Sequence, residues 1–357
     1  MLVIDADTHI DETEATWDYM EGDAARYRPA TLEFAGGRGF VAGDARPHRL
    51  WQIEGQFRLR RWRDDKRTGT TKETRELTDI AARMRQMDEL GVDVQVLYPT
   101  LFLGAISTHP EVELALCRSY NRWIANATAA SQGRLRWVAL IPFLSLDKAV
   151  DELRFAAGHG ACGVFKKGIE YGERAATDPF FFPVYEEASR LNLPICIHTG
   201  SGDPRNSDAT TALAANANQA NLTAIGAFTS LVLGGIPEMF PKLRFGWIEA
   251  SASWVPYLIH DLEAKRKRLS ALQFDLKRDL LRESRFYVTC DTLDDLPYIL
   301  TFGAEDSLMV GSDYGHADQS AEIDAVNVIR HKGQAGEIGG AIATKIISDN
   351  PRRFYGL

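Results

Sequence analysis

The chain alternates short apolar runs with segments of helical periodicity, and this alternation is repeated eight times. Eight strands separated by helices predict a (β/α)8 barrel. A doubly wound sheet is the alternative, but it usually has fewer strands, and DADTH stands where its glycine-rich phosphate loop would follow the first strand. The expected strands cover residues 2–7, 92–100, 134–143, 162–168, 193–200, 243–250, 285–291 and 307–315, and the expected helices cover 76–91, 111–130, 146–159, 183–191, 221–233, 254–269, a short stretch near Leu296, and 337–349.

The length of 357 residues suits one barrel domain over 1–357 that carries insertions. The main irregularity is the long interval 10–75 after the first strand, which makes the expected barrel a distorted one. Within it, Arg49 to Arg75 holds nine Lys and Arg against four Asp and Glu. Two interpretations stand: a solvated insertion that pairs subunits in a homodimer, or a lid whose Arg58 and Arg61 bind a substrate carboxylate through their forked guanidinium groups.

Composition excludes several classes of protein. The net charge of −8 and pI near 5.6 argue against a general nucleic-acid binder. No apolar stretch reaches the ~18 residues of a membrane span, and no signal peptide is visible, so we expect a cytoplasmic protein that acts on a small molecule. Four widely spaced cysteines predict free, buried thiols; they are Cys117, Cys162, Cys196 and Cys290.

Ionisable residues stand where the expected strands end. In a barrel the chemistry gathers at the carboxyl ends of the strands, so these side chains are expected to share one face. A lone histidine there is usually structural, but five strands ending in such groups would bury charges together at a cost that a cation offsets. Imidazole and carboxylate ligands suit zinc, manganese or iron(II). The residues are Asp5, Asp7 and His9, then Lys166 and Lys167, His198, Glu249, and Asp313 with His316.

Four motifs carry a family resemblance: DTH at the first strand, CIHTG, VGSDYGHAD, and the terminal NPRRFYGL. Together they resemble the amidohydrolase superfamily, and within it the second amidohydrolase family, which includes aminocarboxymuconate-semialdehyde decarboxylase and the resorcylate-type decarboxylases. The resemblance implies a distorted (β/α)8 barrel with one divalent metal, zinc first and manganese or iron as alternatives. The implied ligands are Asp7, His9, His198 and Asp313, and Asp5 is expected deeper as a partner of a ligand.

Two positions depart from the family pattern. Asp7 stands where the family usually has His or Glu, which shortens the ligand by one methylene but keeps an anionic oxygen. Glu249 stands where many family decarboxylases have a histidine. It is expected to act as a general base, to hold a water, to recognise substrate or to ligate the metal; capping of the helix that begins near Ser253 is the structural alternative.

The implied activity is that of a metal-dependent hydrolase. In this interpretation a metal-activated water attacks a small carboxylated or aromatic substrate, while Asp313 and Glu249 are the catalytic residues. The first alternative is a metal-dependent, non-oxidative decarboxylase of an aromatic or unsaturated acid, and the second is a barrel that has lost catalysis. Glu249 in place of histidine favours hydrolysis.

The remaining candidates are substrate-binding residues. Lys166 and Lys167 are expected to bind a substrate carboxylate; the alternatives are a solvated pair, or a carboxylated lysine that bridges two metals. His316 and Trp254 are expected to contact substrate, with a helix-start role and core packing as their respective alternatives.

Overall fold

The computed structural model describes residues 1–34, 48–60, 64–200, 213–268, 276, 278–317 and 320–357. Eight parallel strands form one sheet, and each pairs with the next along the chain. The strands are β1 (Ile4–His9), β5 (Val94–Tyr98), β6 (Leu135–Ala139), β7 (Ala161–Lys167), β10 (Ile195–His198), β11 (Phe245–Ile248), β12 (Phe286–Cys290) and β13 (Leu308–Val310). All eight predicted strands are therefore present; β1 and β7 are shifted by one or two residues from the predicted ranges, and the other six are shorter than predicted.

The sheet closes on itself through the segment that follows β13. The backbone N–H of Asp313 donates to the carbonyl of Asp7 at 3.0 Å, and the N–H of His9 donates to the carbonyl of Tyr314 at 2.8 Å. These bonds join the last strand to the first, as a barrel requires. The predicted (β/α)8 barrel is confirmed, and its closing seam lies where the candidate ligands of β1 and the β13 loop stand.

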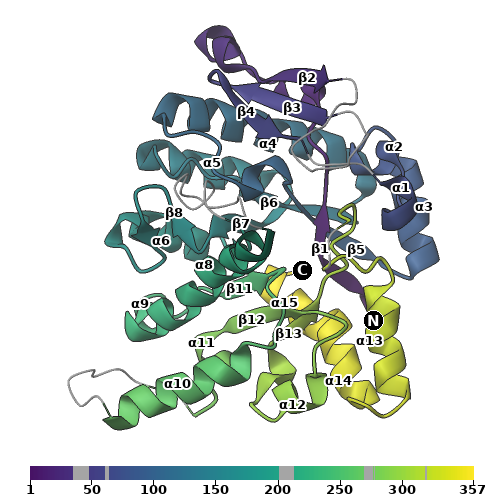
Figure 1. The fold of residues 1–357 in the computed structure, drawn as a ribbon, viewed down its shortest axis with the longest axis vertical. Coiled ribbons are helices and arrows are strands. Elements are labelled where there is room, and N and C mark those ends of the chain that lie inside the picture. Colours follow the sequence, from purple (N-terminus) through teal and green to yellow (C-terminus); the bar gives the residue numbers. More distant parts are fainter. Residues whose placement is uncertain (35–47, 61–63, 201–212, 269–275, 277, 318–319) are drawn as a thin grey trace.

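Helices surround the barrel and cover the outer face of its strands (Figure 1). Local signals explain where they begin and end: the Asp79 side chain accepts from the N–H of Ala82 at the start of the first long helix, and Gly91 ends it at φ +65°. The larger helices are α3 (Ile80–Leu90), α4 (Pro110–Thr128), α5 (Leu146–Gly158), α6 (Phe182–Arg190), α8 (Leu213–Leu233), α10 (Val255–Arg268) and α13 (Ala325–Gln334).

The last helix, predicted over 337–349, begins at Gly340 and continues to Tyr355. Gly336 and Gly339 adopt φ of +80° and +79°, which ends α13 and starts a new segment. The chain then forms α14 (Gly340–Thr344), a π-helical turn (Lys345–Asp349) and α15 (Asn350–Tyr355). Asn350 ties this end to the barrel, because its amide donates to the carbonyl of Leu308 at 2.7 Å.

The interval 10–75 holds a small sheet of its own at one end of the molecule (Figure 1). Three antiparallel strands form it: β2 (Ala30–Phe34), β3 (His48–Ile53) and β4 (Gln56–Leu59). Trp17 and Trp51 pack edge to face within this region, 5.9 Å apart. Whether the region acts as a lid or as a subunit contact stays a prediction.

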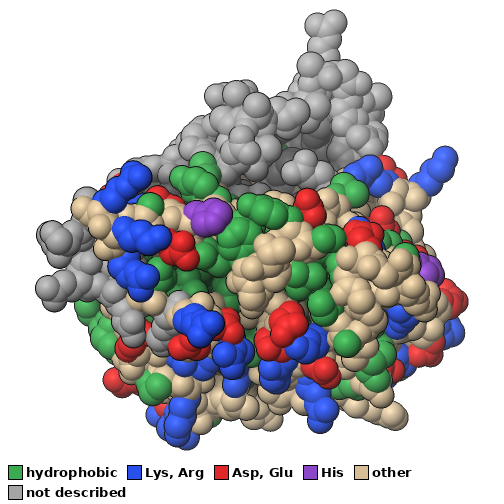
Figure 2. All heavy atoms as spheres, turned by 90° about the horizontal axis from the view of Figure 1, so that it is seen from below, with side chains coloured by type: hydrophobic (Ala, Val, Ile, Leu, Met, Phe, Trp, Pro, Cys, Tyr) green, Lys and Arg blue, Asp and Glu red, His purple; other side chains and the backbone are tan. Residues whose placement is uncertain are grey.

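The charged side chains on the surface and the state of the cysteines agree with what the sequence predicts. On the face seen in Figure 2, Lys and Arg side chains lie among Asp and Glu side chains. The four cysteines are buried and free, as predicted. Among the described residues, no helix is both long enough and apolar enough to cross a membrane.

Candidate metal centre

The carboxyl ends of β1, β10 and β11 meet the loop after β13 and bring six ionisable side chains together. His9 and Glu249 belong to two overlapping sets of four whose ligand atoms all lie within 4.8 Å of one another. The four ligands implied by the resemblance are divided between the two sets, with Asp313 apart from Asp7 and His198, and Glu249 and His316 join them. One set is Asp7, His9, His198 and Glu249; the other is His9, Glu249, Asp313 and His316.

Both central histidines are held by a backbone carbonyl. Nδ1 of His9 lies 3.0 Å from the carbonyl oxygen of Pro99, and Nδ1 of His198 lies 3.0 Å from that of Thr199. A carbonyl oxygen only accepts, so each Nδ1 carries the hydrogen and each Nε2 presents a lone pair to the cluster. Metal-binding histidines are commonly fixed in this way.

The ligand atoms have the spacing that one cation requires. Nε2 of His9 lies 3.5 Å from Oδ1 of Asp7, 3.6 Å from Oε2 of Glu249 and 3.5 Å from Oδ1 of Asp313. Nε2 of His198 lies 3.7 Å from Oδ1 of Asp7 and 3.3 Å from Oε2 of Glu249. Atoms bound about 2.1 Å from one tetrahedral ion lie about 3.4 Å apart.

Buried polar atoms in this cluster lack hydrogen-bond partners within the described chain. They include Nε2 of His9, Nε2 of His198 and Oδ1 of Asp7. Leaving such atoms unsatisfied is costly, and a divalent cation would satisfy all three at once. The residues therefore fit a metal ion, and the cluster is a candidate metal-binding site.

The charges of the cluster act on His198. Burial lowers the pKa of its imidazole, but the neighbouring carboxylates of Asp7 and Glu249 outweigh burial and raise the pKa above its usual value. The same surplus of negative charge would attract a cation.

His316 extends the cluster away from β10. Its ring stacks on that of His9, with centroids 3.7 Å apart, and its Nδ1 lies 2.6 Å from Oδ1 of Asp313. Its Nε2 lies 3.1 Å from the hydroxyl of Thr100. That hydroxyl donates to the carbonyl of Ile10 at 2.6 Å, so toward His316 its oxygen accepts, and Nε2 of His316 carries a hydrogen.

Two of the clustered carboxylates stand on strained backbone. Glu249 has φ of +55° and Asp313 has φ of +50°, a region that side chains other than glycine rarely adopt. Hydrogen bonds hold both. The N–H of Glu249 donates to the hydroxyl of Thr289 at 2.9 Å. The Ser320 hydroxyl lies 3.1 Å from a carboxylate oxygen of Glu249 and 3.1 Å from one of Asp313, and its single hydrogen serves the two. Before α10 the N–H groups of Ala252 and Ser253 bond to Asp294 and Ser251, and whether Glu249 caps the helix stays a prediction.

The remaining predicted residues are described by their packing. Lys166 is fully buried under the ring of Phe181, 4.1 Å from its centroid, and burial lowers its pKa. Whether Lys166 or Lys167 bridges two metals stays a prediction. Trp254 packs on Phe228, 5.3 Å between ring centroids, among core aromatics.

Arg58 lines a cavity of about 430 Å³ that reaches Thr100, the partner of His316. Its Nε donates to the carbonyl of Ala105 at 3.2 Å, and it pairs with no carboxylate within the described part of the chain. Arg61 lies outside the described residues. The role of both arginines in binding substrate stays a prediction.

Sequence reasoning missed the residues that position the ligands. Thr100, Thr289, Ser312 and Ser320 hold His316, Glu249, Asp5 and Asp313. Serine and threonine near a strand end do not by themselves indicate a site. The sequence signal available was that Ser312 and Ser320 lie close to Asp313 in the chain.

A closed parallel barrel with histidines and carboxylates at the carboxyl ends of its strands defines a metal-dependent enzyme class. The Amidohydrolase family model matches residues 4–357, so the chain belongs to that family. A curated relative, 2-amino-3-carboxymuconate-6-semialdehyde decarboxylase of Dictyostelium discoideum, is 21% identical over 242 residues. That match covers 66% of this chain and 66% of the relative, just under two thirds of each.

Solved structures share the fold. Amidohydrolase map2389c of Mycobacterium avium subsp. paratuberculosis K-10 superposes with a TM-score of 0.79 at 17% identity, covering 99% of both chains. A 5-carboxyvanillate decarboxylase of Novosphingobium aromaticivorans, solved with manganese and 4-hydroxy-3-methoxy-5-nitrobenzoic acid, gives 0.62 at 18% identity, covering 82% of this chain and 84% of its own. At sequence identities of 17% and 18%, the similarity to these structures shows a shared fold and nothing further.

Proposed function

We propose that this protein is a metal-dependent, non-oxidative decarboxylase of a small aromatic or unsaturated acid. The observation that carries the proposal is the pair of tethered histidines, His9 and His198, whose Nε2 atoms face buried carboxylates at 3.3–3.7 Å. Two of the relatives named above are decarboxylases, which supports this activity over the hydrolysis that Glu249 favoured from the sequence. Zinc remains the metal that we expect first. Manganese is the alternative, and the relative that was solved with manganese supports it.

The resemblance implies that Asp7, His9, His198 and Asp313 would hold the cation. The ligand atoms of Asp7, His9 and His198 lie within 4.8 Å of one another and of Glu249, whereas Asp313 belongs with His9, Glu249 and His316 to the second set, so Glu249 would replace or join Asp313 as a ligand. When bound, a divalent ion supplies positive charge that binds a substrate carboxylate and a neighbouring hydroxyl or enol oxygen. The protein's own residues then fix where the acid lies and where its proton comes from.

Decarboxylation breaks the bond between a ring or vinyl carbon and its carboxylate. Carbon dioxide leaves, the electron pair stays on the carbon, and that carbon takes one proton. Asp313 and His316 suit the role of donor, because Oδ1 of Asp313 lies 2.6 Å from Nδ1 of His316 and each side chain can carry a proton. Thr100 accepts from Nε2–H of His316, which leaves Nδ1 for Asp313, and solvent would restore the proton after each turnover.

The test is carbon dioxide release from a panel of hydroxybenzoates and unsaturated acids, with metal content measured in parallel. Asp313→Asn should lower turnover about 10²- to 10⁴-fold while the circular dichroism spectrum shows that the variant keeps its fold. Asp147→Asn, an exposed position on α5, is the matched control and should behave as wild type. Hydrolysis of amides or lactones without carbon dioxide release, or full activity in Asp313→Asn, would contradict the proposal.

A further inference from the structure

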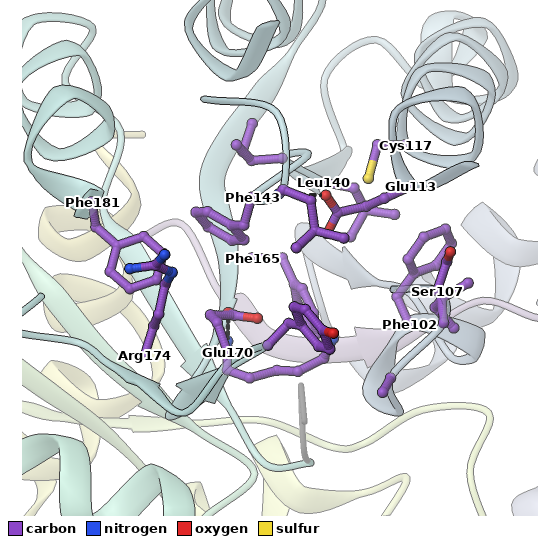
Figure 3. A pocket seen from close by; sticks show the side chains of 16 residues that line it. Phe102, Ser107, Glu113, Cys117, Leu140, Phe143, Phe165, Glu170, Arg174 and Phe181 are labelled. Atoms are coloured by element: carbon purple, nitrogen blue, oxygen red, sulfur yellow. Dashed lines mark hydrogen bonds between the residues drawn. The ribbon is translucent and has the colours of Figure 1, made fainter. Parts of the chain in front are cut away.

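A second cavity lies between α4 and the ends of β6 and β7 (Figure 3). We call it the side pocket. Aromatic and aliphatic side chains make up most of its wall, and the ring of Phe165 in that wall lies 5.8 Å from the ring of His198. The side pocket therefore adjoins the candidate metal centre. Its apolar wall includes Phe102, Leu140, Phe143, Phe165 and Phe181.

Lys167 brings a positive charge into the side pocket. It is paired in register with His198 between β7 and β10, and residues paired in this way point to the same face of a sheet. Only 9% of Lys167 is exposed. Within the described chain its ammonium has neither a carboxylate within 4.0 Å nor a hydrogen-bond acceptor, and Nζ lies 5.7 Å from the centroid of Phe165.

Most other charges around the side pocket already have partners. Glu170 accepts from Nζ of Lys166 at 3.4 Å and from the N–H of Lys167 at 2.9 Å. Arg174 pairs with Asp178 at 3.1 Å. Within the described residues, the ammonium of Lys167 is thus the buried cation of this wall that has no ion-pair partner, and an anion bound beside it would offset the cost of burying its charge.

The carboxyl group of Glu113 also faces the side pocket, but it neutralises the positive charge of Lys167 only in part. Its Oε2 accepts from the N–H of Leu144 at 2.6 Å. Burial, together with repulsion from Glu170, raises its pKa to about 7 even though Lys167 acts in the opposite direction. Near neutral pH a fraction of Glu113 is therefore protonated and carries no charge.

We propose that the side pocket binds a second anionic group of the substrate, with Lys167 as its counter-ion. The proposal rests on the decarboxylase function and narrows it: the substrate is an aromatic or unsaturated acid with two carboxylates. One carboxylate would lie at the metal centre and the other at Lys167, while the apolar body packs on Phe165. A carboxylate bound to a buried ammonium forms a charge-assisted hydrogen bond, which is among the stronger polar contacts.

Binding can be measured without turnover, by isothermal titration of the protein as purified. Benzene-1,3-dicarboxylate should bind about 10-fold or more tightly than benzoate. Lys167→Gln should abolish that preference and leave benzoate binding unchanged, while Lys167→Arg should retain it. Lys148→Gln, an exposed lysine of α5, is the control and should behave as wild type.

Glu113→Gln gives a second, independent test. At pH 8 the wild-type Glu113 is largely ionised and repels the bound carboxylate, so the variant should bind the dicarboxylate several-fold more tightly there. Equal binding of both probes to wild type, a preference that survives Lys167→Gln, or no gain in Glu113→Gln would overturn the proposal. Failure of the decarboxylase function alone would appear differently, as an intact dicarboxylate preference without carbon dioxide release from any acid.

Discussion

Ser312 donates two hydrogen bonds to Asp5: its N–H lies 2.8 Å from Oδ1, and its hydroxyl lies 2.6 Å from Oδ2. The pair ties β1 to the segment after β13 directly before Asp313, whose positive φ must be held in place. Burial raises the pKa of Asp5 to about 7, against the effect of both Ser312 bonds. The observed partner of Asp5 is Ser312, the neighbour of a ligand in the chain, so its expected role as a partner of a ligand stays a prediction.

Ser312→Ala should therefore weaken metal binding without removing any ligand. Loss of a partner that orients a metal ligand typically costs 10- to 100-fold in affinity. Loss of one hydrogen bond should also lower the free energy of unfolding by about 1 kcal/mol. Competition with a chelator gives the affinity, and urea unfolding gives the stability. Ser119→Ala, which removes a buried bond to the carbonyl of Thr16, is the control; an equal loss of affinity in both variants would show a general effect instead.

Protein purified without added metal or chelator should carry about one divalent ion per chain. His198→Ala should reduce this to near zero, because His198 supplies one of the Nε2 atoms that face Asp7 and Glu249. A chelator should lower the unfolding midpoint of wild type but not of the variant, since a ligand bound to the folded state stabilises it. Elemental analysis and thermal unfolding are the measurements.

His260→Ala serves as the comparison for that experiment, because its ring packs on Phe302 at the exposed side of α10. It should keep its metal. Two ions per chain in wild type would support the bridging-lysine interpretation. No bound ion, even after reconstitution with metal, would mean that the polar side chains at the strand ends pair with one another instead.

The barrel could be predicted because its signal is local. Each strand is a short apolar run, each helix repeats its apolar residues at helical spacing, and parallel strands bring their carboxyl ends to one face. That reasoning alone placed His9, His198 and Asp313 together, although His9 and Asp313 are far apart in the chain.

The residues around the ligands could not be predicted, for two physical reasons. First, their bonds join distant segments through common side chains, as between Thr100 and His316, 216 positions apart. Second, the direction of a side chain cannot be read from the sequence where the backbone turns. Glu249 and Ser251 both have positive φ, and Trp254, which follows them, faces the core. Lys166 and Lys167 illustrate a related difficulty, because β7 is buried on both faces and its apolar pattern does not say which lysine faces inward.

Gly311→Ala should disrupt the metal centre through Asp7. A Cβ at position 311 would lie 2.3 Å from the Cβ of Asp7 and 3.0 Å from its backbone nitrogen, closer than atoms can approach. The strand ends must separate, so we expect metal affinity to fall at least 10-fold and stability to fall by about 1–3 kcal/mol. Chelator competition and urea unfolding measure the two effects. Gly226→Ala on α8, where an added Cβ meets nothing within 4 Å, should leave metal binding unchanged, and an unaffected Gly311→Ala would show that this contact is not needed.

Glu113 should make stability depend on pH. Its pKa is about 7 in the folded protein, mainly because of burial, and near the ordinary value of 4.5 in the unfolded chain. Between these values the folded state binds more protons than the unfolded state, so stability falls as pH rises from 5 to 8. Glu113→Gln cannot ionise and should lose this component, so its fall in unfolding free energy should be smaller than that of wild type by on the order of 2 kcal/mol. Urea unfolding at both pH values measures it, with Glu111→Gln on the exposed side of α4 as the control. Parallel pH profiles for wild type and Glu113→Gln would mean that Glu113 is already ionised in the folded protein, and Lys167 would then have a full counter-charge of its own.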